Sequence, residues 1–535
     1  MKAKEYDYII VGAGSAGCVL ANRLSEDATN KVLLLEAGGK DNKLYIGIPA
    51  AFSNLHRTDV DWGFWTEPQQ HVNNRAIYIP RGKALGGCST TNAMAYVRGN
   101  KHDYNEWARL GNSGWSYEEV LPYFKKSEHN EDLKNDYHGQ NGLLNVTHPR
   151  YYRTDFSQAF IQACKEIGLA ENNDYNGAEQ QGAGMFQFTI KDGKRHSTAA
   201  AFLKPAMQRE NLSVITHAHA KQILLEGKKA VGVEYIRKNK IEKVYASKEV
   251  ILSAGAFQSP QLLMLSGIGD PAELTKHGIA VKHELPGVGK NLQDHLFVVT
   301  SSLSKKQDGF NHHLKPFQQI KDLVRYYFSS GKGPLTCSPL EAVAFLAVNG
   351  SDTVNLQFHF APMHLGNDYA ANFYDPDTFP RIDGYSIAPT LLKPKSRGYV
   401  GLKSADPLAA PLIQPNFLSA PDDMQVLVEG CKLALEAMHT HAFKPHVKEV
   451  ITPVDRTDKG LEEHIRKSVE TIFHPVGSCK MGKDDMAVVN DKLQVHGIDG
   501  LRVADASIMP VIVAGNTNAA CIMIGEKASD LVLSN

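Results

Sequence analysis

The hydrophobic pattern of the chain begins with a short apolar run at residues 8–11, followed by glycines and then by a second apolar segment. This order predicts a β-strand, a tight turn and an α-helix that begins near Ser15. A further apolar run at residues 32–35 predicts the next strand. Strands that alternate with a helix in this way are typical of a parallel sheet in an α/β protein.

The middle of the chain shows a different pattern. Residues 354–360 alternate between polar and apolar side chains, and residues 399–402 form a short apolar run, which predicts antiparallel strands. The helical period of residues 424–438 predicts a helix that covers this sheet. Proline suits the first turn of a helix, so Ser259–Pro260 predicts the start of another one. Three aromatic residues of this region either pack in the core or line a pocket: Phe358, Phe360 and Tyr385.

The glycines of the first turn match a dinucleotide-binding fingerprint. Gly12, Gly14 and Gly17 allow a tight turn, close approach of a pyrophosphate and close packing of helix on strand. The helix that begins at Ser15 directs free N–H groups at the phosphates. Glu36 ends the second strand, where it can accept hydrogen bonds from ribose hydroxyls and would repel the extra phosphate of NADP. An isolated fingerprint marks any tight strand-to-helix turn, and it does not distinguish FAD from NAD.

Composition excludes several classes of partner. The 58 basic and 58 acidic residues give no net charge, so we expect no nucleic-acid partner and no electrostatic attraction to anionic membranes. Seven scattered cysteines without ligand spacing favour a reduced, cytoplasmic protein that binds no metal. The sequence contains no apolar run of membrane-spanning length, and 535 residues exceed one ordinary domain.

Later segments carry a resemblance to a known family. They are PRGKALGGCSTTNAMAYVRGN from Pro80, SAGAFQSPQLLMLSGIG from Ser253, LPGVGKNLQDH from Leu285, TIFHPVGSCKMG around His474 and AGNTNAACIMIGEKASDLV around Asn516. Together with the first strand, they resemble the glucose-methanol-choline (GMC) oxidoreductases, in particular the branch of choline dehydrogenase. The resemblance covers nearly the whole length and implies bound FAD and oxidation of an alcohol.

The resemblance also implies a two-part fold. We expect an α/β, Rossmann-like FAD-binding domain that is discontinuous and consists of residues 1–155, 195–310 and 465–535. An α+β substrate-binding domain built on an antiparallel sheet is expected to be interleaved with it, at residues 156–194 and 311–464.

The resemblance and the fingerprint together predict the residues around the cofactor. These are Gly12, Gly14, Ser15, Gly17, Glu36, Ala37, Gly82, Gly87, Asn92, Ala93, Ala220, Asp505, Ala506 and Thr517. Asp505 ends an apolar strand, and ligands of open α/β sheets lie beyond such ends, although a turn cap is the alternative role. Thr91 matches the position where some relatives bind FAD covalently through histidine. We therefore expect noncovalent FAD.

The family places its catalytic histidine in the HPVGSCKMG segment, which makes His474 the expected base. Neutral imidazole accepts a proton near neutral pH, and Pro475 holds the backbone in a loop. A second family residue, histidine or asparagine, corresponds to Asn516. Its amide is no strong base but can donate to a developing alkoxide. Phe473 is expected to touch the substrate.

We therefore expect oxidation of a primary alcohol to an aldehyde by hydride transfer to the flavin N5, with His474 as base. The acceptor is oxygen or a quinone-like compound or dye. One alternative is a hydroxynitrile lyase that retains FAD without net redox chemistry, and another is a flavin-binding protein without turnover. The sequence leaves monomer and dimer open.

Overall fold

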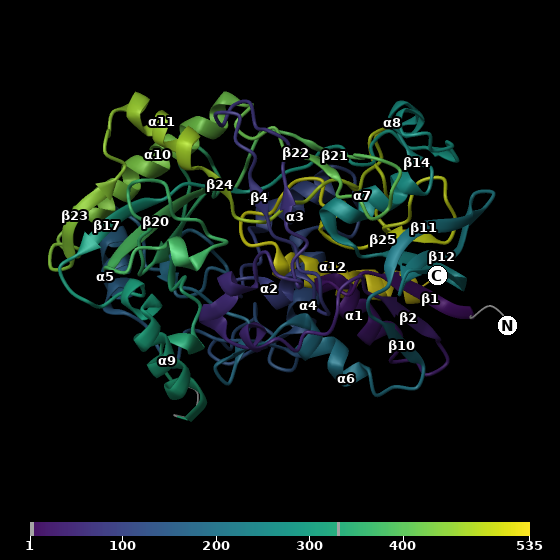
Figure 1. Cartoon of the computed structure of the whole chain (residues 1–535), viewed down its shortest axis with the longest axis horizontal. Coiled ribbons are helices and arrows are strands. Elements are labelled where there is room, and N and C mark those ends of the chain that lie inside the picture. The colour runs from purple at the N-terminus through teal and green to yellow at the C-terminus, as the bar shows by residue number, and fades with distance from the viewer. Residues whose placement is uncertain (1–4, 329–331, 535) are drawn as a thin grey trace.

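The computed structural model describes residues 5–328 and 332–534, and two large β-sheets dominate it (Figure 1). The first sheet has the strand order β10-β2-β1-β13-β12-β11, with β25 also beside β13. Its strands are β1 (Glu5–Val11), β2 (Val32–Leu35), β10 (Leu212–Ile215), β11 (His219–Glu226), β12 (Lys229–Arg237), β13 (Lys240–Leu252) and β25 (Leu501–Val503). Strands β10, β2, β1, β13 and β25 are parallel, and β11 and β12 add an antiparallel edge. The predicted parallel α/β unit is therefore present.

The first and last helices of the chain pack against each other beside this sheet. They are α1 (Ser15–Leu24) and α12 (Asn518–Leu533), and α4 (Tyr117–Ser127) packs on the outer side of α12. A Cβ at Gly525 would lie 2.9 Å from the Ala16 carbonyl oxygen, so the two helices meet at a glycine. Arg23 of α1 forms a two-pronged ion pair with the buried Glu526, with both N–O distances 2.8 Å.

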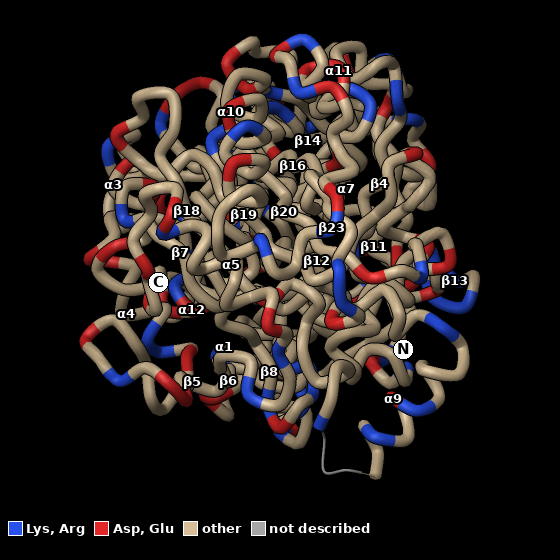
Figure 2. The backbone as a smooth tube through the Cα atoms, turned by 90° about the vertical axis from the view of Figure 1, so that its left-hand side faces the viewer, with Lys and Arg blue, Asp and Glu red and all other residues tan. Residues whose placement is uncertain are grey.

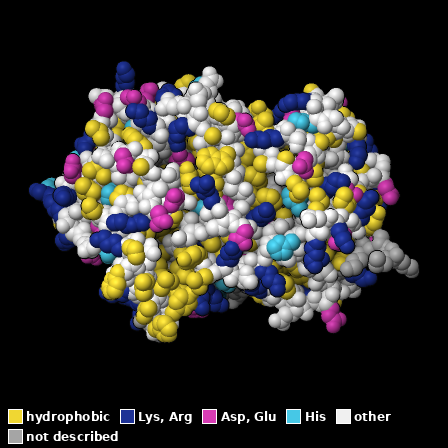
Figure 3. All heavy atoms as spheres, in the orientation of Figure 1, with side chains coloured by type: hydrophobic (Ala, Val, Ile, Leu, Met, Phe, Trp, Pro, Cys, Tyr) yellow, Lys and Arg dark blue, Asp and Glu magenta, His cyan; other side chains and the backbone are white. Residues whose placement is uncertain are grey.

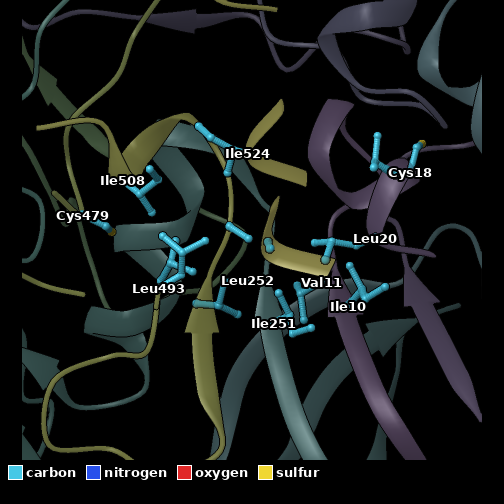
Figure 4. Close-up of a cluster of buried hydrophobic side chains, with 14 of the residues drawn as sticks. Ile10, Val11, Cys18, Leu20, Ile251, Leu252, Cys479, Leu493, Ile508 and Ile524 are labelled. Carbon is cyan, nitrogen blue, oxygen red and sulfur yellow. The ribbon is translucent and has the colours of Figure 1, made fainter. Parts of the chain in front are cut away.

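The core of this first part of the molecule draws on both ends of the chain. Figure 4 shows Ile10 and Val11 of β1, Leu20 of α1 and Ile251 of β13 close to side chains from the last sixty residues, including Ile508 and Ile524. All of these side chains are fully buried or nearly so. The C-terminal segment is therefore part of the nucleotide-binding fold and not an appendage to it.

The second sheet is antiparallel and has the strand order β23-β17-β20-β19-β18-β7, with β16 also beside β20 and β24 beside β16. Its strands are β7 (Gly182–Met185), β16 (Leu296–Phe297), β17 (Thr300–Ser304), β18 (Ala342–Leu346), β19 (Leu356–Ala361), β20 (Gly384–Leu391), β23 (Val447–Thr452) and β24 (Glu470–Thr471). Helices α5 (Asp155–Glu166) and α10 (Pro421–Met438) cover one face, and α11 (Asp458–Ser468) packs on α10. The alternation and the helical period that we read in this region correspond to β19 and α10.

Shorter elements complete the described part of the chain. The remaining α-helices are α2 (Cys88–Thr91), α3 (Lys101–Arg109), α6 (Lys204–Ala206), α7 (Gly255–Leu265), α8 (Pro271–Lys276) and α9 (Pro316–Phe328). Small two-stranded sheets pair β3 (Phe64–Trp65) with β4 (Tyr78–Ile79), β5 (Glu128–Asn130) with β6 (Leu144–Val146), β8 (Ile190–Lys191) with β9 (Lys194–Arg195), β14 (Ile268–Gly269) with β15 (His283–Glu284) and β21 (Tyr399–Gly401) with β22 (Leu412–Gln414). The apolar run at 399–402 thus forms a separate hairpin.

Helix α7 corrects one expectation, because it begins at Gly255 and not at Ser259. Pro260 lies inside the helix, where it cannot donate a hydrogen bond to the carbonyl of Ala256. That carbonyl instead accepts a hydrogen bond from the Ser478 hydroxyl. The C-terminal segment thus satisfies the carbonyl that proline leaves free.

The division into interleaved domains stays a prediction. Strands β16 and β17 lie inside the range 195–310 that we assigned to FAD binding, yet they pair with the antiparallel sheet. All seven cysteines are free. Within residues 5–328 and 332–534, no helix is long and apolar enough to cross a bilayer.

Candidate active site

A large cavity of about 480 Å³ extends from the carboxyl ends of the first sheet to the uncovered face of the second sheet. Every site residue that we predicted from the sequence lines it, with the exception of Gly17. A Cβ at Gly17 would lie 1.9 Å from the Gly12 carbonyl oxygen, so this glycine serves the close packing of helix on turn. Phe473 lines the cavity as well.

The nucleotide end of the cavity consists of two glycine-rich loops in contact. Gly12 has φ +103°, and a Cβ there would lie 2.4 Å from the carbonyl oxygen of Ser253. A Cβ at Gly87, which has φ +51°, would lie 2.8 Å from Gly14 Cα. No side chain caps helix α1 at Gly14, so its first N–H groups remain available to an anionic ligand. This cradle fits a pyrophosphate.

Glu36 lies at the end of β2, buried at the edge of the cavity. One carboxylate oxygen accepts the N–H of Ala13 at 2.8 Å, and the other accepts the N–H of Gly38 at 2.7 Å. Burial raises the pKa of Glu36 to about 7. Each carboxylate oxygen keeps a lone pair, so the side chain retains capacity for ribose hydroxyls.

Asp505 caps the turn that follows β25. Its carboxylate accepts the N–H of Ser507 at 2.8 Å, the N–H of Gly255 at 2.9 Å and the hydroxyl of Ser259 at 2.5 Å. The capping role that we gave as the alternative is therefore present, and the residue lines the cavity at the same time. Its function there is to hold the β25 turn against the start of α7.

Asn92 and Ala93 follow the short helix α2 and face the cavity. The Asn92 side-chain oxygen accepts hydrogen bonds from the N–H of Met94 at 3.0 Å and from Arg195 at 2.8 Å. Arg195 is buried and contributes a positive charge behind this loop. No sequence motif identified Arg195, because it comes from a different segment of the chain.

The position of His474 depends on a strand pairing between distant segments. Strand β16 pairs with β24, and beyond this pair the backbone groups of Gln293 and Val476 exchange hydrogen bonds of 3.1 and 2.9 Å. Asp294 accepts the N–H of His474 at 2.7 Å. Residues 293–297 therefore run alongside the His474 loop and fix its backbone.

His474 Nε2 lies 3.3 Å from the side-chain nitrogen of Asn516, within the cavity. Burial lowers the pKa of His474 well below 6.5, and the nearby His295, His359 and Arg81 act in the same direction. The imidazole is therefore neutral at neutral pH. The side-chain oxygen of Asn516 is buried without a hydrogen-bond partner, so it can accept one from a ligand.

A second buried histidine determines which nitrogen of His474 carries the proton. His295 Nε2 lies 3.1 Å from the Leu392 carbonyl, which only accepts, so this nitrogen must carry hydrogen. Burial lowers the pKa of His295 to about 3, so its Nδ1 is unprotonated. His474 Nδ1 lies 3.0 Å from that atom and must donate to it. His474 Nε2, on the cavity side, is left as a proton acceptor.

Our reading of the sequence did not assign two histidines near the site: His295, which is buried and contacts His474, and His359, which lines the cavity. His295 ends the LPGVGKNLQDH segment, which we read only as a mark of the family. His359 on β19 lines the cavity, whereas its neighbours Phe358 and Phe360 pack in the core with Tyr385. The alternation of β19 could have assigned these faces, since successive side chains of a strand point to opposite sides.

Comparison with known proteins settles the family. The GMC oxidoreductase profiles match residues 6–297 and 394–525. The chain belongs to the GMC oxidoreductase family. It is 45% identical to an "Alcohol dehydrogenase [acceptor]" of Pseudomonas putida, over 99% of this chain and 96% of that protein. It is 42% identical to an "Oxygen-dependent choline dehydrogenase" of Sinorhizobium fredii, over 98% and 95% of the two chains.

Solved structures agree with this membership. The pyridoxine 4-oxidase from Mesorbium loti superposes with a TM-score of 0.90 at 29% identity and covers 99% of both chains. A formate oxidase of Aspergillus oryzae, in a study of FAD modification, gives 0.92 at 28% identity over 99% and 98% of the two chains. The predicted fold, the FAD dependence and the enzyme class, an oxidoreductase acting on CH–OH donors, are confirmed.

Proposed function

We propose that this GMC oxidoreductase oxidises an uncharged primary alcohol to the aldehyde, with His474 as the base. The observation that carries the proposal is the proton-accepting Nε2 of His474, held in the cavity beside Asn516. Bound FAD supplies the hydride acceptor at its N5 atom. The predicted cofactor residues would hold it, with the glycine loops at the pyrophosphate and Asn92 and Ala93 at the flavin ring.

His474 and Asn516 have different roles in activating the alcohol. His474 Nε2 takes the hydroxyl proton, and Asn516 donates to the developing alkoxide. The proton gained makes His474 a cation, whose Nδ1–H already donates to neutral His295. A positioned base of this kind contributes roughly 10²–10⁴-fold to the rate.

The lining of the cavity supports an uncharged substrate with an apolar chain. Toward the second sheet the described lining residues include the apolar Phe297, Val299, Met363, Phe373 and Phe379. The carboxylates on the described lining are Glu36 and Asp505, at the nucleotide end, and Asp322. The last is already hydrogen-bonded to His313 at 2.6 Å. Away from the nucleotide end, a quaternary ammonium group would therefore find one carboxylate on the described lining, and that carboxylate is already hydrogen-bonded to His313.

Three finer points complete the proposal. Thr91 on the cavity wall supports noncovalent FAD, because its hydroxyl does not replace a histidine as an attachment point. The seven free cysteines support a cytoplasmic location. The electron acceptor is oxygen or a quinone-like compound. The relatives and structures named above are oxidoreductases, and we do not propose the lyase alternative.

One experiment tests the proposal. Purified enzyme is mixed anaerobically with hexanol, benzyl alcohol or choline, and bleaching of flavin absorbance is followed by stopped flow. We expect the two apolar alcohols to reduce the flavin with appearance of the aldehyde, and choline to react at least ~100-fold more slowly, the scale set by an unpaired buried charge. His474→Ala should slow reduction by roughly 10²–10⁴-fold at unchanged FAD content.

Two outcomes would count against it. Reduction by the His474→Ala variant at the wild-type rate would remove His474 as base. Preference for choline would remove the uncharged substrate. Measurement of peroxide formation and of dye reduction in air then distinguishes oxygen from a quinone-like acceptor. Release of FAD on acid precipitation tests whether the cofactor is bound noncovalently.

A further inference from the structure

Helix α9 presents an apolar surface to solvent that nothing in the described structure covers. Five large side chains form this apolar stripe, with exposed fractions of 81, 63, 53, 52 and 84% respectively: Phe317, Ile320, Val324, Tyr327 and Phe328. They recur at intervals of three and four residues and so occupy one face of the helix. Figure 3 shows hydrophobic side chains gathered at this place, at the lower left of the molecule.

The charges around the stripe are of one sign. Lys321 and Arg325 lie on α9, Lys315 precedes it and Lys332 follows it, all exposed and without an ion-pair partner among the described residues. The one acid of the helix, Asp322, is buried and bonded to His313. Figure 2 shows the basic positions along α9, whereas acidic and basic positions alternate over most of the molecule. A local cationic patch is therefore present although the chain as a whole has no net charge.

We propose that α9 docks the enzyme on an anionic lipid surface. An amphipathic helix with large apolar side chains on one face and cations beside them lies in the interface of a bilayer. A second copy of the chain fits less well, because a symmetric contact through α9 would bring the cations of both copies together with no acid on the exposed surface of the helix. The helix lies on the surface and does not span the membrane.

The opposite face of α9 forms part of the cavity wall, so docking would bring the cavity close to the lipid. Gln319, Asp322 and Leu323 line the large cavity, and Tyr326 anchors the helix by donating to the carbonyls of Gly47 and Gly193. The wall of the cavity therefore lies directly behind the lipid-facing stripe. An apolar alcohol dissolved in the bilayer would reach the site over a short path. This delivery role rests on the proposed function, whereas the docking does not.

Vesicle sedimentation tests the docking without any measurement of turnover. The holoenzyme is mixed with vesicles of phosphatidylcholine alone or with phosphatidylglycerol added. We expect at least ~10-fold stronger partition into the anionic vesicles, and a loss of at least ~10-fold in two double variants, Phe317→Ser with Phe328→Ser and Lys321→Gln with Arg325→Gln. None of these four residues lines the cavity, so oxidation of a water-soluble alcohol and the melting temperature should stay unchanged.

A matched control uses exposed apolar residues on the other part of the molecule. Ile241 of β13 and Leu408 are 58 and 61% exposed, so the Ile241→Ser, Leu408→Ser variant should bind vesicles as the wild type does. Equal binding by the α9 variants and the wild type would overturn the proposal. So would a solution dimer, seen by analytical ultracentrifugation, that the Phe317→Ser, Phe328→Ser variant dissociates while vesicles fail to bind.

Discussion

At the scale of single residues, hydrogen bonds that link Leu392, His295 and His474 determine which nitrogen of His474 can accept a proton. The Leu392 carbonyl fixes the proton on His295, and His295 in turn fixes the proton on His474. Among the residues that the structure describes, the partner of His474 Nδ1 is His295 and not a carboxylate, so the imidazolium formed in the reaction is stabilised by a neutral ring. His295 acts through His474 and is a positioning residue.

Replacement of His295 should expose this role. His295→Leu removes the acceptor for His474 Nδ1–H, so that the proton can move to Nε2 and block the base. We expect kcat/KM to fall by about 10–100-fold, a typical effect of removing a partner that orients a reactive imidazole. His295→Gln should recover most of the loss, because its amide can accept from His474 and donate to Leu392 at once. Equal activity of the leucine and glutamine variants would contradict the positioning role.

The pH profile provides the second readout. Burial lowers the pKa of His474, so the neutral, accepting form persists below pH 6.5 and protonation removes it only in acid. The wild-type kcat/KM should therefore be level through neutral pH and fall on the acidic side of 6.5. His295→Leu should lower the plateau, since the tautomer is wrong at every pH, whereas a merely unstable variant would lose FAD content instead.

At the scale of elements, local patterns predicted the first strand, the glycine turn, α1 and β2 because each depends on neighbouring residues. The His474 loop was found through its motif, but its partner His295 was not, since only the pairing of residues 293–297 with 470–476 brings them together. The predicted start of α7 was also wrong because it depends on a contact with a distant segment. Ser478, more than two hundred residues away, satisfies the carbonyl that makes an internal proline tolerable.

The contact of the two glycine loops leads to a prediction about cofactor content. Gly87→Ala would place a Cβ 2.8 Å from Gly14 Cα and separate the loops that form the pyrophosphate cradle. We expect the purified variant to retain less than about a tenth of the wild-type FAD, as judged by the ratio of visible to ultraviolet absorbance. This follows if the separation raises the Kd of FAD to about ten times the free FAD concentration or more.

Gly227 offers a control for an alanine at a positive φ. It has φ +58°, close to the +51° of Gly87, but a Cβ there would meet nothing within 4 Å. Gly227→Ala therefore tests the cost of an alanine at positive φ, roughly 1 kcal/mol in the left-handed helical region, without touching the cradle. Gly87 has ψ −132° and lies outside that region, so its own backbone cost is larger. Equal loss of FAD in both variants would show that strain alone, and not the loop contact, accounts for the effect.

At the scale of the whole molecule, the two ends of the chain form one nucleotide-binding unit. Ser15 at the start of α1 donates to Asn518 at the start of α12 at 2.7 Å, and Arg23 pairs with Glu526 farther along the same helices. Glu526→Ala removes a fully buried carboxylate from this pair. We expect the free energy of unfolding in urea to fall by roughly 3 kcal/mol, in line with breaking other buried pairs.

Arg23 also pairs with Glu26, whose side chain is 49% exposed, at the same distance of 2.8 Å. Glu26→Ala should change the free energy of unfolding by about 0.5 kcal/mol or less, because water screens that pair. The two variants remove a partner from the same arginine and differ in burial. Similar losses from both would mean that the contact between the helices contributes little.

The union of α1 with α12 also bears on how the chain is made. Arg23 and Glu526 lie 503 residues apart, and ribosomes add about 5–20 residues per second, so α1 waits roughly 25–100 s for its partner. During that time the helix has sheet strands beside it but an uncovered apolar side. The nascent polypeptide therefore carries an unfinished binding site until its last segment emerges, and it is a natural client for chaperones throughout synthesis.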